Sequence, residues 1–360
     1  MQELAIKTRT SSYPIYVGKD CLLNLQSFTE KASRVIVVTD ETVHHLHYSY
    51  LQQYLPKNSL VYVLEPGEGS KSFESYYHLQ YFLIQHQIDR GSLVLAFGGG
   101  VVGDLAGFVA ATYMRGIDFI QIPTTLLAHD SAIGGKVAIN HEQGKNLIGA
   151  FYPPKAVIYE LPLLLTLSDK EWRSGLAEML KHGFIQDTYL LDELMQRTSI
   201  IKLNNSNFSD LLERSLRVKQ HLVEMDEFEK GQRAFLNFGH TFGHAVELTN
   251  KALSHGEAVA IGMLFALYVS QLELGLSYHL DELIKYLTEW GYPLEIDELK
   301  LNEYMEYMSH DKKNVNQGLR FVLLEHVAKP QLVILTKEKT KDYLQQFLVW
   351  LKDRRELTCV

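Results

Sequence analysis

Short apolar, β-branched runs alternate with helical stretches along the first half of this 360-residue chain, and this alternation constrains the fold more than any other feature. The runs are continuously apolar, which is typical of strands buried on both faces of a parallel sheet. They lie at residues 13–17, 35–39, 60–64, 93–97, 119–122 and 156–159. Helical patterns such as those at 73–87 and 104–114 separate them. The order predicts a doubly wound, Rossmann-like α/β domain of the nucleotide-binding type.

The second half has a different pattern. From Asp169 onward helical periodicity dominates, and the runs at 318–324 and 331–335 predict one small late hairpin. We therefore expect two domains, an α/β domain at 1–161 and a mostly α-helical domain at 162–360. We expect the functional site in the cleft between them.

Composition and charge narrow the class of protein. A hydrophobic content of 46% with 22% charged residues is ordinary for a soluble enzyme of about two domains. Lysine and arginine number 35 against 43 acids, so the net charge of 35 − 43 = −8 argues against nucleic-acid binding and polybasic membrane attachment. Only Cys21 and Cys359 are present. They indicate neither a disulfide framework nor a thiolate metal site, and they favour a reducing compartment.

Two further features predict a cytoplasmic protein that does not span a membrane. The first residues lack the apolar core of a secretion signal. The longest uncharged apolar run, 258–272, is shorter than the roughly 20 residues that a membrane-spanning helix needs. We expect this run to form a buried helix.

A histidine-rich segment carries the chemistry of a metal site. His240 and His244 stand four residues apart, so on a helix both rings project from one face. A turn separates them from His255, and an antiparallel helical hairpin would return His255 to the same place. The best carboxylate is Glu178, because a lone acid in an apolar helical turn is costly to bury without a partner. A glutamate and two histidines form a catalytic zinc set that leaves one position open for substrate.

A glycine-rich turn predicts a phosphate-binding site. The sequence GGGVVGD at 98–104 ends a strand run and opens a helix, which places backbone N–H groups at a helix N-terminus. The pattern alone is weak, since a plain tight turn would look the same. Polar residues that follow other strand runs support it, including Asp40, Glu68 and Thr124. The next segment, 130–146, mixes acids, lysines and asparagines with glycines and is also typical of a solvated loop.

These blocks resemble the 3-dehydroquinate synthases, of the sugar-phosphate cyclase group, over essentially the whole chain. The matching blocks are PGEGSK at 66–71, GGGVVGD at 98–104, ATYMRG at 111–116, PTTLL at 123–127, GGK at 134–136, GKN at 144–146, GLAE at 175–178, LNFGH at 236–240 and HGE at 255–257. Each block is modest by itself, but all of them in this order are highly specific. The GGK form favours dehydroquinate synthases over inosose and valiolone cyclases, although the segment 126–129 is one residue shorter than in many members.

The resemblance implies a dehydroquinate synthase-like fold and the second step of the shikimate pathway. In that step 3-deoxy-D-arabino-heptulosonate 7-phosphate becomes 3-dehydroquinate plus phosphate. NAD acts catalytically, because a ring hydroxyl is transiently oxidised, phosphate is eliminated, the ketone is reduced again, and an aldol step closes the ring. The α/β domain would bind NAD, and the helical domain would bind a divalent metal ion, zinc or cobalt, and the substrate. A homodimer is implied as well.

The resemblance also assigns residues by matching position. Glu178, His240 and His255 resemble the metal ligands, which the four-residue spacing alone does not distinguish from His244. The residues that resemble catalytic and substrate-binding groups are Arg115, Asp130, Lys136, Asn146, Lys181, Lys219, Glu229, Arg233, Asn237, His244 and one of the pair Lys312 and Lys313. Those that resemble NAD contacts are Asp40, Thr42, Glu68, Lys71, Gly99, Gly100, Val101, Asp104, Thr124, Thr125, Lys136, Lys145 and Thr166.

Three alternatives remain open. A metal- and NAD-dependent polyol or alcohol dehydrogenase would share the architecture and cofactors, but it would accumulate NADH and need no phosphate site. The many placed cations favour the cyclase. A sister sugar-phosphate cyclase would act on another substrate. A non-enzymatic sensor of metal and nucleotide is less favoured, because such descendants usually lose ligands and all of them are present here.

Overall fold

The computed structural model describes residues 1–196, 206–310 and 318–358 and divides them into two compact units. The first unit holds Met1–Leu167 and the described part of Lys202–Phe228. The second holds the described parts of Ser168–Ile201 and Glu229–Val360. The first unit thus ends six residues later than the expected boundary and takes one helix from the second half of the chain.

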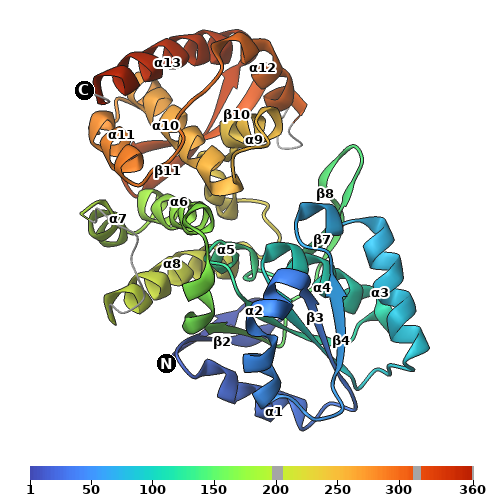
Figure 1. Cartoon of the computed structure of the whole chain (residues 1–360). Coiled ribbons are helices and arrows are strands. Elements are labelled where there is room, and N and C mark those ends of the chain that lie inside the picture. The colour runs from blue at the N-terminus through green and yellow to red at the C-terminus, as the bar shows by residue number, and fades with distance from the viewer. Residues whose placement is uncertain (197–205, 311–317, 359–360) are drawn as a thin grey trace. The chain divides into compact units, whose positions relative to one another are not determined.

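A seven-stranded sheet forms the centre of the first unit (Figure 1). Its strands, in spatial order, are β1 (Gln2–Lys7), β2 (Ser12–Gly18), β9 (Ala156–Glu160), β6 (Asp118–Pro123), β5 (Leu93–Gly98), β3 (Val35–Asp40) and β4 (Leu60–Leu64). All neighbours are parallel except the β1–β2 hairpin. The six apolar runs of the sequence all form strands of this sheet, and the Rossmann-like prediction is confirmed.

Helices cover both faces of the sheet. Alternate residues of β3 enter two different cores, Ile36 and Val38 one of them and Val35 and Val37 the other. The first core also holds side chains from α3 (Phe73–Gln85) and α4 (Gly100–Thr112). The second holds side chains from α2 (Glu41–Leu51). Burial on both faces is why these strands are continuously apolar.

A second hairpin lies where the sequence pattern is also typical of a loop. It consists of β7 (Lys136–His141) and β8 (Gly144–Phe151), which pair with each other. Most side chains of β8 are at least partly exposed, so its sequence shows neither a continuous apolar run nor clear alternation. The sequence pattern also did not predict strand β1. Only Leu4 and Ile6 of its six residues are buried, so it contains no continuous apolar run.

Helix α8 (Ser206–Met225) and the residues after it cover the edge strand β1. The side-chain amide of Gln220 donates to the carbonyl oxygen of Ala5 at 2.8 Å, and the backbone N–H of Lys7 donates to Glu224 at 2.8 Å. Edge strands expose unpaired backbone groups, and these side chains satisfy some of them. Helix α8 also contacts β2 and the short helix α5 (Ala128–Ser131), so it belongs to the first unit through long-range contacts that no local sequence pattern predicts.

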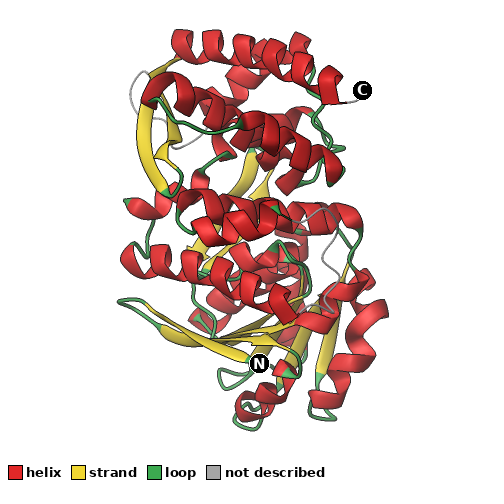
Figure 2. Ribbon diagram, turned by 90° about the vertical axis from the view of Figure 1, so that its left-hand side faces the viewer, coloured by secondary structure: helices red, strands yellow, loops and turns green. Residues whose placement is uncertain are grey.

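The second unit consists mainly of helices, as expected. They are α6 (Asp169–Ile185), α7 (Thr188–Met195), α9 (His240–Thr249), α10 (His255–Leu274), α11 (Leu280–Glu289), α12 (Leu301–His310) and α13 (Lys337–Thr358). The predicted late hairpin is present as β10 (Gly318–His326) and β11 (Lys329–Thr336) (Figure 2). Helix α10 is long and apolar enough to cross a membrane, but 72% of its apolar window is buried inside the unit. It forms the core helix that the sequence predicts.

Candidate metal and nucleotide sites

In the second unit the carboxylate of Glu178 lies between two imidazoles. Its Oε1 atom is 3.4 Å from Nε2 of His240 and 3.3 Å from Nε2 of His255. Ligand atoms 2.0–2.2 Å from a tetrahedral zinc ion lie on the order of 3.3–3.6 Å apart, so these distances fit two edges of such a site. The residue is 1% exposed, and its Oε2 atom faces the ammonium group of Lys181 one turn along α6.

The surroundings of this carboxylate also fit a cation. Lys181 and the two imidazoles surround it, but none of the described donors meets hydrogen-bond geometry at either oxygen. Burial raises the pKa of Glu178, but Lys181 and the imidazoles outweigh burial and hold this pKa well below its usual range. The carboxylate is therefore ionised and available to a metal ion.

Each imidazole is oriented by a hydrogen bond at its other nitrogen. Nδ1 of His240 lies 3.1 Å from the carbonyl oxygen of Phe238, and Nδ1 of His255 lies 3.0 Å from Glu247. Such partners commonly orient metal-binding histidines. Burial lowers the pKa of His255, but the neighbouring carboxylates of Glu178 and Glu247 outweigh burial and raise it to about 10. An ion that binds here displaces this proton.

His244 lies beside the same cluster. One ring nitrogen from each of His240, His244 and His255 lies within 4.8 Å of the others, so a set of three imidazoles is a second possible ligand set. We favour the set with Glu178, because its carboxylate is buried and lies 3.3–3.4 Å from both Nε2 atoms. In that set His244 is not a ligand but lies beside the ligands, where it would face substrate.

Close backbone contacts bring the ligands together. A Cβ atom added to Gly256 would lie 2.0 Å from the carbonyl oxygen of Ser174, so only glycine allows α10 to approach α6 here. The N–H of Gly256 donates to the hydroxyl of Ser174 at 3.0 Å. A Cβ atom added to Gly262 would lie 1.9 Å from the carbonyl oxygen of Gly239, which sets the approach of α10 to α9. His255, Glu178 and His240 start from these three helices.

Three other predicted residues of this unit lie around the 3₁₀ helix Gln232–Asn237, which ends just before α9. Arg233 is 1% exposed. The side-chain amide of Asn237 donates to Glu229 at 3.1 Å, so these two predicted residues contact each other. Glu229 has a left-handed backbone conformation with φ of 55°.

In the first unit the glycine-rich turn begins α4, and Gly99 is its N-cap. A Cβ atom added to Gly98 would lie 2.6 Å from the side chain of Val102, so the chain is packed tightly against the helix. The hydroxyl of Thr124, at the end of β6, is buried and has no hydrogen-bond partner among the described residues. An N-terminal helix turn beside an unpartnered buried hydroxyl fits an anionic ligand such as the pyrophosphate of NAD.

A second group joins residues predicted for NAD and for substrate. The ammonium group of Lys71 contacts Asp104 and the side-chain oxygen of Asn146. Burial raises the pKa of Asp104, and Lys71 offsets this only in part. Asn140 ties the group together, because it donates to Glu68 at 2.7 Å and accepts from the N–H of Asn146 at 3.0 Å.

The remaining predicted residues of the first unit lie at several places. Asp40 is the last residue of β3 and the N-cap of α2, and Thr42 lies in the first turn of that helix. The hydroxyl of Thr166 lies 2.8 Å from Nε2 of His47, which is also on α2. Asp130 and Lys219 form an ion pair at 3.2 Å. The others occupy the helix α4 turn, the end of β6, the β7–β8 hairpin and the 3₁₀ turn after α4: Gly100, Val101, Thr125, Lys136, Lys145 and Arg115. Lys312 and Lys313 lie outside the described residues.

Comparisons with known proteins decide the family. Models of the N-terminal and C-terminal parts of 3-dehydroquinate synthase match residues 61–174 and 175–314. The chain belongs to the 3-dehydroquinate synthase family. A relative from Bacillus pumilus with that name is 44% identical over 96% of this chain and 98% of its own length. One from Bacillus cytotoxicus is 42% identical over 96% of each chain.

Solved structures agree on the fold. A 2-deoxy-scyllo-inosose synthase complexed with carbaglucose-6-phosphate, NAD+ and Co2+ matches with a TM-score of 0.82 and 25% identity, over 96% of this chain and 100% of that one. A probable glycerol dehydrogenase from Sinorhizobium meliloti matches with a TM-score of 0.64 and 15% identity, over 94% and 97%. The second likeness shows a shared fold alone. The predicted family and fold class are confirmed.

Three residues that support the candidate metal and nucleotide sites were not predicted from the sequence. Glu247 orients the ring of His255, and the hydroxyl of Ser174 accepts a hydrogen bond from the N–H of Gly256. Asn140 forms hydrogen bonds with the predicted residues Glu68 and Asn146. Glu247 stands three residues after His244 on α9, so its position on the histidine face of that helix was a usable signal. Asn140 and Ser174 act through long-range contacts and leave no such signal.

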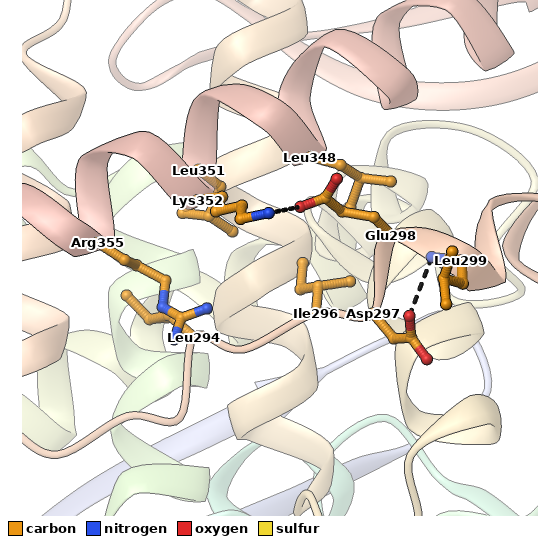
Figure 3. Close-up of a pocket in the computed structure, with 9 residues that line it drawn as sticks. All are labelled: Leu294, Ile296, Asp297, Glu298, Leu299, Leu348, Leu351, Lys352 and Arg355. Atoms are coloured by element: carbon orange, nitrogen blue, oxygen red, sulfur yellow. Dashed lines mark hydrogen bonds and ion pairs between the residues drawn. The ribbon is translucent and has the colours of Figure 1, made fainter.

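A cavity of about 410 Å³ lies elsewhere in the second unit (Figure 3). It is lined by Leu294, Ile296, Asp297, Glu298, Leu299, Leu348, Leu351, Lys352 and Arg355. None of these residues is predicted to take part in the reaction. Both basic side chains at its rim are already in ion pairs: Nζ of Lys352 lies 3.1 Å from Glu298, and the guanidinium group of Arg355 lies 2.8 Å from Glu295, just outside the lining. We therefore assign this cavity no role in the reaction.

Proposed function

We propose that this protein catalyses the 3-dehydroquinate synthase reaction, the conversion of 3-deoxy-D-arabino-heptulosonate 7-phosphate to 3-dehydroquinate and phosphate. The observation that carries the proposal is the buried Glu178 carboxylate, 3.3–3.4 Å from two imidazole nitrogens, in a chain of this family. NAD, when bound, supplies the transient oxidation and re-reduction of a substrate hydroxyl, and a divalent metal ion, zinc or cobalt, polarises substrate oxygens.

The chain's own residues hold these components. Glu178, His240 and His255 would bind the metal ion and leave a position open for a substrate oxygen. His244 is adjacent and would contact substrate at that position. Lys181 faces Glu178 and keeps the carboxylate ionised.

The first unit would hold NAD. The N-terminal turn of α4 offers N–H groups to the pyrophosphate, with Gly99, Gly100 and Val101 at the contact. The Lys71, Asp104 and Asn146 group lies beside α4, since Asp104 is part of that helix. The other predicted contacts to NAD are Asp40, Thr42, Glu68, Thr124, Thr125, Lys136, Lys145 and Thr166.

Cations are needed for the substrate, which carries a carboxylate and a phosphate dianion. Arg115, Lys136, Lys219 and Arg233 are proposed for this task, together with one of the lysines at 312 and 313. Asp130 pairs with Lys219 at 3.2 Å and would hold its ammonium group in place until substrate arrives. Asn237, supported by Glu229, would bind a substrate hydroxyl.

We further propose that the enzyme acts as a homodimer in the cytoplasm, with no nucleic-acid partner and no membrane attachment. The net charge of −8 supports the absence of a nucleic-acid partner, and the burial of α10 supports the absence of a membrane span.

Phosphate release from the heptulosonate phosphate, followed with and without a chelator while NADH is recorded, tests the proposal. The expected result is phosphate release that stops when the metal is chelated and resumes when zinc or cobalt is added. A sister cyclase would release no phosphate from this substrate. A dehydrogenase would produce NADH on a panel of polyols, and either outcome would contradict the proposal.

A further inference from the structure

One face of helix α6 contacts the turn before α10 and the first residues of that helix. Four side chains at positions i, i+3, i+4 and i+8 share this face: Lys170, Arg173, Ser174 and Glu178. Nζ of Lys170 donates to the carbonyl oxygen of Ala252 in the turn at 2.7 Å. Ser174 and Glu178 contact Gly256 and His255, as described above. The fourth side chain, that of Arg173, binds Glu257, the last residue of the HGE block.

The carboxylate of Glu257 is buried, and both of its oxygens are bonded. Its side chain is 2% exposed, and the guanidinium group of Arg173 donates to Oε1 through Nε at 2.9 Å and through Nη2 at 2.8 Å. Oε2 accepts from the backbone N–H of Ser254 at 2.8 Å and from its hydroxyl at 2.9 Å. Removing either partner of a buried ion pair is costly, so this pair holds α6 and the start of α10 in one arrangement.

We propose that Arg173 and Glu257 are positioning residues that fix the orientation of His255, an inference that rests on the proposed metal site. Gly256 lets α10 approach α6 at one point, and a helix held at one point can still rotate about it. The Arg173–Glu257 pair adds a second point one residue later, so it fixes the rotation of the first turn of α10. His255 is the first residue of that turn, and its Nε2 atom lies 3.3 Å from Glu178.

A metal site tolerates little displacement of a ligand. Metal–ligand distances in well-formed sites vary by about 0.2 Å, so a larger shift of the His255 ring weakens binding. Arginine suits this role better than lysine, because its planar guanidinium group donates two N–H groups in a fixed geometry and so sets direction as well as distance. Neither Arg173 nor Glu257 is in the proposed ligand set. Their effect on the ion is therefore exerted through the position of His255.

Three variants test this role: Arg173→Lys, Glu257→Gln and the combination of both. Arg173→Lys keeps a positive charge opposite the buried carboxylate, which guards against misfolding. Glu257→Gln leaves one acceptor oxygen, which cannot serve both Arg173 and Ser254. Arg355→Lys is the matched control, because it makes the same change in an ion pair of the same 2.8 Å length on α13.

Metal-free protein is titrated with zinc and with cobalt, and circular dichroism shows that each variant is folded during the titration. The visible absorption of bound cobalt reports the geometry of its ligands. Wild type and control should have the same affinities and the same cobalt spectrum. We expect binding to weaken about tenfold in Arg173→Lys and about 10- to 100-fold in Glu257→Gln, with an altered cobalt spectrum in both. The double variant should bind no more weakly than Glu257→Gln alone, because the two residues act as a pair.

A purely stabilising role of the pair would lower the unfolding temperature of the variants and leave metal affinity and cobalt spectrum unchanged. That result, or losses of affinity that simply add in the double variant, would overturn the positioning role while the proposed function stands. A wild type that binds neither ion would contradict the proposed metal site, and with it both the reaction and the positioning role. Metal binding by the wild type therefore separates failure of the proposed function from failure of this inference.

Discussion

The two units position functional residues in different ways. In the second unit Glu178, His240 and His255 project from three helices whose backbones touch at glycines, and Glu178 and His240 are buried while His255 is partly exposed. In the first unit the predicted NAD residues stand at strand ends and on a hairpin, where side chains such as Asn140 tie them together. A helix-built site depends on backbone approach, whereas a loop-built site depends on individual hydrogen bonds. Single changes should therefore be severe in the second unit and graded in the first.

The largest effect is expected for Gly256→Ala. The added methyl group would meet the Ser174 carbonyl oxygen at 2.0 Å, so α10 must move away from α6 and carry His255 away from Glu178. We expect a loss of about 3 kcal/mol or more in the free energy of unfolding and a loss of metal binding. Thermal unfolding and metal content measure both. Gly69→Ala is the control, because an added Cβ there meets nothing within 4 Å. Equal stability of the two variants would contradict the proposed role of the glycine contact.

His255→Ala should abolish turnover and leave the fold largely intact. Loss of an outer hydrogen-bond partner costs 10- to 100-fold in metal affinity, so loss of a ligand should cost more than about 100-fold. His244→Ala is the matched change, since it should lower turnover while the metal stays bound. Titration with zinc and with cobalt measures the metal affinity of both variants, which should fall in His255→Ala and stay the same in His244→Ala. If His244→Ala loses the metal and Glu178→Ala keeps it, the three-imidazole set is the correct one.

A graded effect is expected for Asn140→Ala in the first unit. The change removes two side-chain hydrogen bonds, to Glu68 and from Asn146, worth about 1 kcal/mol each. The dissociation constant of NAD should rise by about tenfold, while metal affinity stays the same. Titration with NAD, followed by fluorescence, measures this. Gln143→Ala on the exposed turn of the same hairpin should change nothing, and a loss of metal binding in Asn140→Ala would break the contrast between the units.

The smallest effect is expected for Glu227→Gln, which loosens the tie between the end of α8 and the β1–β2 turn. Burial raises the pKa of Glu227, but bonds from Thr10, Thr8 and the N–H of Arg9 outweigh burial and lower it. A lowered pKa stabilises the fold above the unfolded pKa of about 4.3, and this contribution disappears as pH falls through the folded pKa.

The variant should therefore lose less than about 1 kcal/mol at pH 7, because solvent screens this charge, and nothing once the pH lies well below 4. Denaturant unfolding at several pH values measures the difference, with the exposed Glu142→Gln as the control. A difference that persists at low pH would show that the carboxylate charge does not matter.

The contrast between the units also explains what the sequence could predict. Strands buried on both faces, such as β3 and β5, are visible as apolar runs because every residue faces a core. Strands β1 and β8 are not visible, since most of their residues are partly exposed. The histidine spacing predicted a metal site, but the approach of His255 to Glu178 depends on contacts between α6 and α10 that no local pattern contains. For the same reason the membership of α8 in the first unit could not be predicted.

The central claim is that NAD is regenerated within each turnover, and one stoichiometry tests it most directly. Enzyme from which bound nucleotide has been removed is mixed with zinc, excess heptulosonate phosphate and one mole of NAD per mole of enzyme. The total amounts of phosphate and NADH are measured when the reaction has ended. The account predicts many phosphates released per NAD with no NADH accumulated. Phosphate release that stops at one equivalent of NAD, or NADH that rises in step with turnover, would contradict it.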